Sequence, residues 1–180
     1  MDSLKGQLLI SGGGLYDPNF RHTVVLIGAH DANGAVGVVL NRPLEVTVHQ
    51  AIPALAELTG PDDALFQGGP VAPDQAVLLI EALNPGIPDV PVFGAVGFMT
   101  GEVSADVRSA VRRARVFLGH SGWGPGQLES ELEADAWIIE PARADDVFTA
   151  EPGVLWRHVL ERKGHPFANL ARIPFDPRAN

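Results

Sequence analysis

Ser121 lies in the sequence Gly119-His120-Ser121-Gly122-Trp123, which is similar to the Gly-x-Ser-x-Gly elbow that presents a nucleophilic serine in hydrolases. A strand is expected before this serine and a helix after it, as the elbow requires. The elbow also needs a small residue at its last position, where this chain has the indole of Trp123. We therefore favour a structural turn with a solvent-facing serine, and we predict no catalytic residue. Partners for the alternative, a catalytic triad, follow in the Ser–Asp–His order: Asp135 or Asp145, then His158 or His165.

Histidine and cysteine content limits the metal chemistry of this chain. The sequence has six histidines and no cysteine, which excludes disulfides, thiolate nucleophiles and cysteine-bound metals. No two histidines have the spacing that places two ligands on one face of a helix. His30, beside Asp31 at the end of an expected strand, is the best single candidate ligand, but we favour a hydrogen-bonded turn histidine. No metal and no cofactor are predicted.

Two glycine-rich segments offer backbone amides to an anion. Residues 12–14 are all glycine and suit a nest of amides, and residues 124–127 stand at the start of an expected helix. Neither segment has the lysine or arginine that normally accompanies phosphate. A phosphate site is therefore not the interpretation we favour for either segment.

Arg42 stands between Asn41 and Pro43 at the end of an expected strand. Proline cannot donate to a strand ladder and biases the preceding residue away from helix, so the guanidinium has a defined direction. Arginine forms planar, bidentate bonds to carboxylates and carbonyls. We favour a clamp on a loop or an acid, with ligand binding as the alternative.

Four arginines gather in one short segment of an acidic chain. The net charge of −9 and the pI near 5.0 disfavour contact with a phosphate backbone. Positions 108, 112 and 115 share one face of an expected helix, so we interpret that face as solvated, and nucleic-acid contact is the alternative. The segment contains Arg108, Arg112, Arg113 and Arg115.

The elements that must position these residues are strands that follow one another through hairpins, with helices inserted between them. Asn33-Gly34 suits the tight turn of one hairpin, and Pro53 is expected to delay or kink the helix that contains it. This order indicates an α+β fold rather than a doubly wound sheet. Strands are expected over residues 6–11, 23–27, 35–40, 76–83, 92–99, 115–119 and 137–139, and helices over 47–58, 104–114, 127–134 and 154–163.

Length and hydropathy predict one domain over residues 1–180. The chain has 180 residues, of which 46% are hydrophobic, which is enough for one normal core. A loosely ordered tail is expected over about residues 172–180, which hold two prolines. No leading apolar run suits a signal peptide, and no stretch approaches the roughly 18 apolar residues of a membrane span. The expected location is the cytoplasm.

Motifs from about residue 6 to residue 165 form one ordered set: Gly6-Gln7-Leu8-Leu9-Ile10, Asp17-Pro18-x-Phe20, Asn41-Arg42-Pro43, Gly68-Gly69-Pro70-Val71 and Gly122-Trp123-Gly124-Pro125-Gly126-Gln127-Leu128-Glu129, then Trp137 and Trp156. The set resembles the YqgE/AlgH family of bacterial proteins. The resemblance implies an α+β domain with a bent, bifurcated, mostly antiparallel sheet, closed into a flattened pseudo-barrel with helices packed outside. The family is largely uncharacterised, and some members are labelled transcriptional regulators.

Three functions follow as hypotheses, with a non-catalytic binding or regulatory domain as the first. Its partner would be a protein or a small molecule, and neither the partner nor the oligomeric state follows from the sequence. The alternatives are an enzyme in which Arg42 positions a small anionic ligand, and a DNA-associated transcriptional regulator, although direct nucleic-acid contact is disfavoured by charge. The predicted binding residues are Asn41, Arg42, Gly68, Gly69, Trp123, Gly124 and Gln127.

Overall fold

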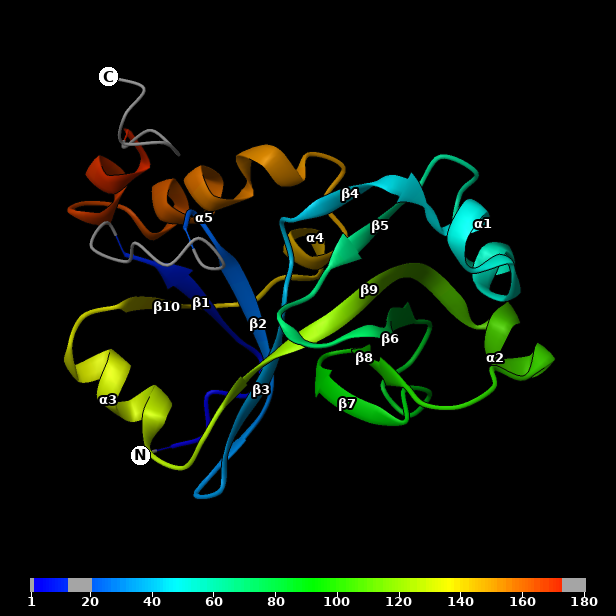
Figure 1. Cartoon of the computed structure of the whole chain (residues 1–180), viewed down its shortest axis with the longest axis horizontal. Helices are drawn as coiled ribbons and strands as arrows, with labels where there is room; N and C mark the ends of the chain where they lie inside the picture. The colour runs from blue at the N-terminus through cyan, green and yellow to red at the C-terminus, as the bar shows by residue number, and fades with distance from the viewer. Residues whose placement is uncertain (1, 13–20, 173–180) are drawn as a thin grey trace.

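The strands form one branched sheet (Figure 1). The computed structural model describes residues 2–12 and 21–172, so the Asp17-Pro18-x-Phe20 motif and residues 173–180 of the expected tail lie outside the described residues. Within these described ranges the sheet has ten strands: β1 (Gln7–Ser11), β2 (Val24–Asp31), β3 (Gly34–Val39), β4 (Pro43–Thr47), β5 (Ala64–Gln67), β6 (Val71–Ala82), β7 (Val90–Phe93), β8 (Val96–Met99), β9 (Val111–Trp123) and β10 (Trp137–Pro141).

The long strand β9 is the point at which the sheet divides. The main strand order is β10-β1-β2-β3-β9-β6-β8-β7, and β4 joins through β5. One edge of β9 pairs with β6, and the other pairs with β3 near Trp123 and, in parallel, with β5 near Phe117. All other described strand pairs are antiparallel.

The expected closure of the sheet into a pseudo-barrel is not confirmed. The main strand order ends at β10 and at β7, and no pairing within the described residues joins those ends. The sheet nevertheless bends. Its strands β2 and β8 are not neighbours in the strand order, yet a Cβ at Gly28 of β2 would lie only 2.6 Å from the Phe98 side chain of β8. The contact between these two strands is therefore made by side-chain packing.

Local turn signals explain several elements. β2 and β3 form the predicted hairpin around Asn33-Gly34, with Asp31 paired to Gly34. The single strand expected over residues 92–99 is wrong, because the chain turns at Gly94 (φ +52°) and forms the β7–β8 hairpin. The sequence predicts that Pro43 ends a strand, whereas in the structure it begins β4. Among the described strands β4 pairs only with β5, and proline is tolerated at such an edge.

Helix caps occur where the sequence predicts them, but two helices are shorter than expected. The Thr47 side chain accepts a hydrogen bond from the Gln50 amide in a capping box, and Pro53 separates α1 from a 3₁₀ turn. Ser104 caps α2, but the predicted extension to residue 114 is wrong, since β9 begins at Val111 and pairs with β6. The helical segments are α1 (Val48–Ala51), η1 (Pro53–Leu58), α2 (Ala105–Ser109), α3 (Gln127–Glu133), α4 (Ala144–Val147), η2 (Pro152–Val154), α5 (Leu155–Lys163) and η3 (Phe167–Arg172).

Helices cover both faces of the β1–β2–β3 region (Figure 1). Successive side chains of a strand point to opposite faces, so Leu8 packs with α5 while Leu9 packs with α3. A third cluster lies between the β6–β9 region and α1, with Val48 and Ile80 buried in it. The chain is therefore a single-domain α+β protein with a mostly antiparallel sheet. Among the described helices, none is both long and apolar enough to span a membrane.

Candidate functional site

Gly68 and Gly69 lie directly against β9. The Gly68 amide donates to the Leu118 carbonyl (2.8 Å), and the Gly68 carbonyl accepts from the Val39 amide (2.9 Å). A Cβ at Gly68 would lie 2.3 Å from the Gly119 carbonyl oxygen, and one at Gly69 (φ +153°) would lie 2.3 Å from the His120 carbonyl. The Gly-Gly pair is therefore required by the close approach of two backbones.

Ser121 is not a nucleophile in an elbow. It lies inside β9, its side chain is fully buried, and its hydroxyl donates to the Gly68 carbonyl (3.2 Å). The expected solvent-facing turn is wrong, because β9 continues past the glycines to Trp123 and pairs there with β3. Asp145 and His158 lie together at another place, in a pocket beside α4 and α5. A triad around Ser121 is thus excluded by the burial of its hydroxyl.

Trp123 anchors α3 to the sheet. Its indole is buried, meets the Trp137 ring edge-on at a centroid distance of 6.2 Å, and donates to Glu131 Oε1 (3.0 Å). Trp137 donates to the same oxygen (2.8 Å), and Gln127 donates to the other carboxylate oxygen (3.0 Å). Gln127 also accepts from the Gly124 amide (3.0 Å). The Gly-Trp-Gly-Pro-Gly motif thus holds the beginning of α3 in place.

Asn41 and Arg42 hold the segment that enters β2. The Asn41 amide group accepts from the Val24 amide (3.1 Å) and donates to the His22 carbonyl (2.8 Å). The Arg42 guanidinium donates to the Arg21 carbonyl and to the Thr23 hydroxyl (2.7 Å). Burial lowers the pKa of Arg42, and burial together with Arg21 and Arg42 lowers the pKa of His22. These contacts fit the clamp that the sequence favours for Arg42.

Backbone contacts bring the three predicted binding segments together in space, each beside the next. The Gln67 amide donates to the Arg42 carbonyl (2.8 Å), and Gly69 lies against the His120–Ser121 peptide. The side chains diverge, however, since Arg42 points toward residues 21–23 and Trp123 toward α3. Ligand binding by the seven predicted residues stays a prediction.

His30 is a hydrogen-bonded histidine, as the sequence favours. Its Nδ1 accepts from the Leu4 amide (3.0 Å), so its Nε2 carries the proton that faces Glu129 Oε1 at 2.5 Å. This bond lowers the pKa of the Glu129 carboxyl. Among the described residues, no three histidine or acidic side chains gather closely enough to hold a metal ion.

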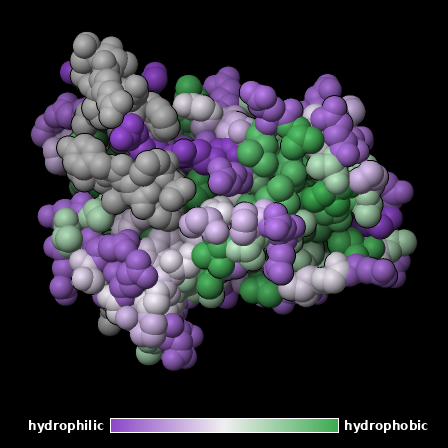
Figure 2. Space-filling view, viewed as in Figure 1, coloured by the Kyte–Doolittle hydropathy of each residue, from purple (hydrophilic) through white to green (hydrophobic). Residues whose placement is uncertain are grey.

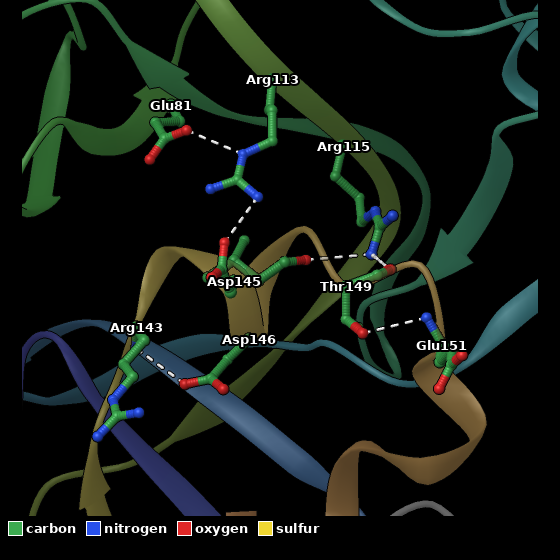
Figure 3. Close-up of polar contacts among 9 residues, drawn as sticks. Glu81, Arg113, Arg115, Arg143, Asp145, Asp146, Thr149 and Glu151 are labelled. Carbon is green, nitrogen blue, oxygen red and sulfur yellow. Dashed lines mark hydrogen bonds and ion pairs between the residues drawn. The ribbon is translucent and has the colours of Figure 1, made fainter. Parts of the chain in front are cut away.

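The predicted helical face of Arg108, Arg112 and Arg115 is wrong, because Arg112 and Arg115 lie on β9, as does Arg113. Arg113 binds Glu81 (2.9 Å) and Asp145 (3.0 Å), and Arg108 binds Glu57 (2.5 Å). Arg115 donates to the carbonyls of residues 147 and 149 and lies 4.5 Å from the centre of the Phe66 ring. Figure 3 shows Arg113 and Arg115 reaching from β9 toward α4. Three of the four charges therefore have partners within the chain.

A polar pocket of about 370 Å³ lies beside α4 and α5. Figure 3 shows its acidic residues Asp145, Asp146 and Glu151. Asp146 is buried and accepts two bonds from Arg162 (2.7 and 2.9 Å), which raise the pKa of that arginine. The central charges of this pocket thus neutralise each other.

A larger apolar groove of about 500 Å³ lies where β3, β6 and β8 meet, and we call it the β6 groove. Val36 and Val90 at the groove are 46% and 41% exposed, so two apolar side chains of its lining are open to water. His120 of β9 also lines it. Hydrophobic residues gather in Figure 2 over the half of the molecule in which Figure 1 places β4, β5 and β9. The other lining side chains include Val38, Val77, Phe98 and Met99.

Three acidic residues stand close in sequence to lining residues of the β6 groove, and we call them its acidic rim; one of them, Asp89, accepts from the amide of the lining residue Thr100 (2.9 Å). Asp74, Asp89 and Glu102 are exposed and stand within two positions of a lining residue. No lysine or arginine stands within two positions of any lining residue. Glu57 also stands near the groove in sequence, but it is paired with Arg108.

The sequence did not point to this groove. Its residues come from six elements, and a valine that faces a groove looks like a core valine in the sequence. The one available signal was the run from residue 71 to residue 77, which interrupts a strand pattern with Pro73 and Asp74.

The fold and the groove define a single-domain α+β protein with a forked sheet and an apolar groove. The sequence model of the AlgH-like family matches residues 8–168, and the chain belongs to this family. The resemblance to the YqgE/AlgH family is thus confirmed.

The similar proteins agree over nearly their whole lengths. A UPF0301 protein of Streptomyces avermitilis is 40% identical over 189 residues, which cover 100% of this chain and 97% of the relative. The AlgH protein of Pseudomonas aeruginosa has a solution structure with a TM-score of 0.69 at 27% identity, covering 94% of this chain and 93% of that one. A crystal structure from Corynebacterium diphtheriae gives a TM-score of 0.85 at 25% identity, covering 92% and 90%.

Proposed function

We propose that this protein is a non-catalytic binding domain that takes an apolar segment of a partner protein into the β6 groove. The observation that carries the proposal is the exposure of Val36 and Val90 at an apolar groove of about 500 Å³. Exposed apolar surface of this kind costs free energy in water, and in soluble proteins it marks interaction sites. We propose this role in the cytoplasm, the location expected from the sequence.

The family motifs support the proposal by shaping the groove. Gly69 lets the chain lie against the His120 peptide, and His120 lines the groove. Val71, which is 43% exposed, pairs with His120 and lies beside Gly122. The Gly-Gly-Pro-Val and Gly-Trp-Gly motifs would thus act by building one wall of the binding surface.

The contacts of the polar residues favour binding over catalysis. The Ser121 hydroxyl is buried against Gly68, and the Arg42 guanidinium donates to the chain itself. An anionic substrate at Arg42 would compete for the guanidinium with these two acceptors of the chain. Direct DNA binding is also disfavoured, since Arg108, Arg113 and Arg115 are engaged within the chain.

The experiment compares two lysine substitutions of exposed apolar residues. Val36→Lys places a charge in the groove, whereas Leu83→Lys changes a side chain that is 62% exposed and does not line the groove. Peptides selected from a random displayed library on the wild-type protein are measured by calorimetry against both variants.

We expect the selected peptides to bind at least about tenfold more weakly to Val36→Lys than to the wild type, because a buried unpaired charge costs more than 1.4 kcal/mol, roughly a factor of ten. Binding to Leu83→Lys should be unchanged. Equal loss in both variants, or a library that yields no binder, would contradict the proposal.

A further inference from the structure

We infer that the β6 groove binds a short extended segment flanked by basic residues, and that this segment pairs with an open edge of β6 in line with β8. The inference rests on the proposed function and specifies its ligand. It is carried by three features of the groove: an unpaired strand edge, apolar walls on both sides of that edge, and an acidic rim.

The open edge lies at Ala76 and Val77. β6 pairs with β9 at both residues, but it pairs with β8 only from Leu78 to Glu81. On the β8 side, no described strand lies beside Ala76 and Val77. The Thr100 amide, which follows β8, instead donates to Asp89 Oδ2 (2.9 Å). β8 therefore stops where the groove begins, and an open strand edge accepts a further strand.

Apolar side chains flank this edge on both faces of the sheet. Val77 and Phe98 belong to the face that packs with the core under α5. Leu78, Met99 and Leu55 belong to the opposite face, under α1 and η1. All five line the groove. Because side chains of a strand alternate between faces, an extended segment at this edge would contact apolar walls with successive residues. Its central residues should therefore be apolar without interruption.

The negative charge of the acidic rim favours a bound segment with basic residues at its two ends. Asp74 precedes the open edge in the sequence. Asp89 and Glu102 are sequence neighbours of Val90 and Gly101, which line the groove. With no lysine or arginine within two positions of a lining residue, these carboxylates attract basic residues. A second copy of this chain would bring its own net charge of −9 and the same acidic rim, so it is a poorer occupant.

The test uses three octapeptides with four central valines. One has two lysines at each end, one has two glutamates at each end, and one is the lysine peptide with N-methyl groups on all four central residues, so that neither edge of its centre can donate. Binding is followed by fluorescence polarisation at about 0.05 M and about 0.5 M salt, because salt screens attraction between exposed charges. The proteins are wild type, Asp74→Lys/Glu102→Lys and a control with the same charge change far from the groove, Asp2→Lys/Glu161→Lys.

We expect the lysine peptide to bind the wild type. Its affinity should be about tenfold lower for Asp74→Lys/Glu102→Lys, and its affinity for the wild type should fall at high salt. The control variant should bind as the wild type does. The N-methylated peptide should not bind, because it cannot donate to a strand edge. Thermal unfolding of each variant shows that it is folded.

Two comparisons would overturn the inference even if the lysine peptide binds: glutamate peptides that bind as tightly as lysine peptides, or N-methylated peptides that bind as tightly as the parent. Absence of binding by the lysine peptide also overturns it. In each case the proposed function still stands if library-selected peptides bind the wild type and are lost in Val36→Lys. The two proposals therefore fail separately.

Discussion

At Gly69 the chain passes so close to β9 that no side chain fits. A Cβ there would lie 2.3 Å from two atoms of the His120 carbonyl group and 2.5 Å from the Ser121 hydroxyl. Because backbone cannot move aside as a flexible side chain can, the two strands must separate to accept even a methyl group. The glycine is thus a packing requirement, and its removal should be felt at His120 and in the groove.

Gly69→Ala should lower the free energy of unfolding by about 2 kcal/mol or more, from overpacking and from backbone strain at a positive φ. The matched control is Gly153→Ala, where a Cβ meets no atom within 4 Å. Urea denaturation of both variants checks this. If Gly69→Ala is as stable as Gly153→Ala, the close approach of these backbones is not a constraint.

Two arginines of this chain, Arg42 and Arg115, hold backbone carbonyl groups. Arg42 holds the carbonyl of residue 21, and Arg115 holds the carbonyls of residues 147 and 149. Burial lowers the pKa of both guanidinium groups, which nonetheless stay charged because arginine titrates far above neutral pH. Such clamps give these buried arginines acceptors within the chain itself.

Among the elements, α3 depends on a single carboxylate. Glu131 accepts from the indoles of Trp123 and Trp137 through one oxygen and from Gln127 through the other. Leu128 of the same helix is buried against the sheet between them. The helix is thus fixed by a polar clamp at the edge of an apolar contact.

Glu131→Ala removes the acceptor of two largely buried indoles. It should cost about 2–4 kcal/mol of unfolding free energy, since each unsatisfied buried donor costs roughly 1–3 kcal/mol. Glu133→Ala, on the same helix and exposed, should change stability by less than about 0.5 kcal/mol. Chemical denaturation followed by tryptophan fluorescence measures both. Equal stabilities would contradict the clamp.

Elements with local signals were predictable from the sequence, and elements set by distant pairing were not. One turn and two helix caps are determined by the side chains and backbone of the residues that form them: the turn at Asn33-Gly34 and the caps at Thr47 and Ser104. These predictions are confirmed. The extension of α2 to residue 114 failed because pairing with β6 overrides a helical pattern of arginines. Trp123 ends a strand instead of following a turn for the same reason.

The candidate site could not be predicted from the sequence, also because it depends on how distant strands pair. The β6 groove exists only because β8 ends beside Met99 while β6 continues, which is a relation between two strands. Val36 and Val90 carry no mark in the sequence that separates exposed valines from core valines. In the sequence His120 stands out as the neighbour of Ser121 and as one of six histidines, and neither feature indicates that it lines a groove.

For the whole molecule, the forked sheet explains where a binding surface can form. β9 pairs with three strands, so the layers on its two sides diverge, and helices cover both faces of the β1–β2–β3 region. The β6 groove lies between the diverging parts, with exposed apolar residues and an acidic rim. The family motifs hold this geometry through backbone contacts, and the central claim is that the groove binds a partner.

Methyl NMR spectra of the wild-type protein during titration with the lysine-flanked valine octapeptide test that claim most directly. We predict saturable shifts of the methyl signals of Val36, Val90 and Met99, which line the groove. The signals of Leu83 and Val154, which are also exposed but do not line the groove, should stay in place. Shifts centred on Leu83 or Val154, or no saturable shift at the groove, would contradict the account.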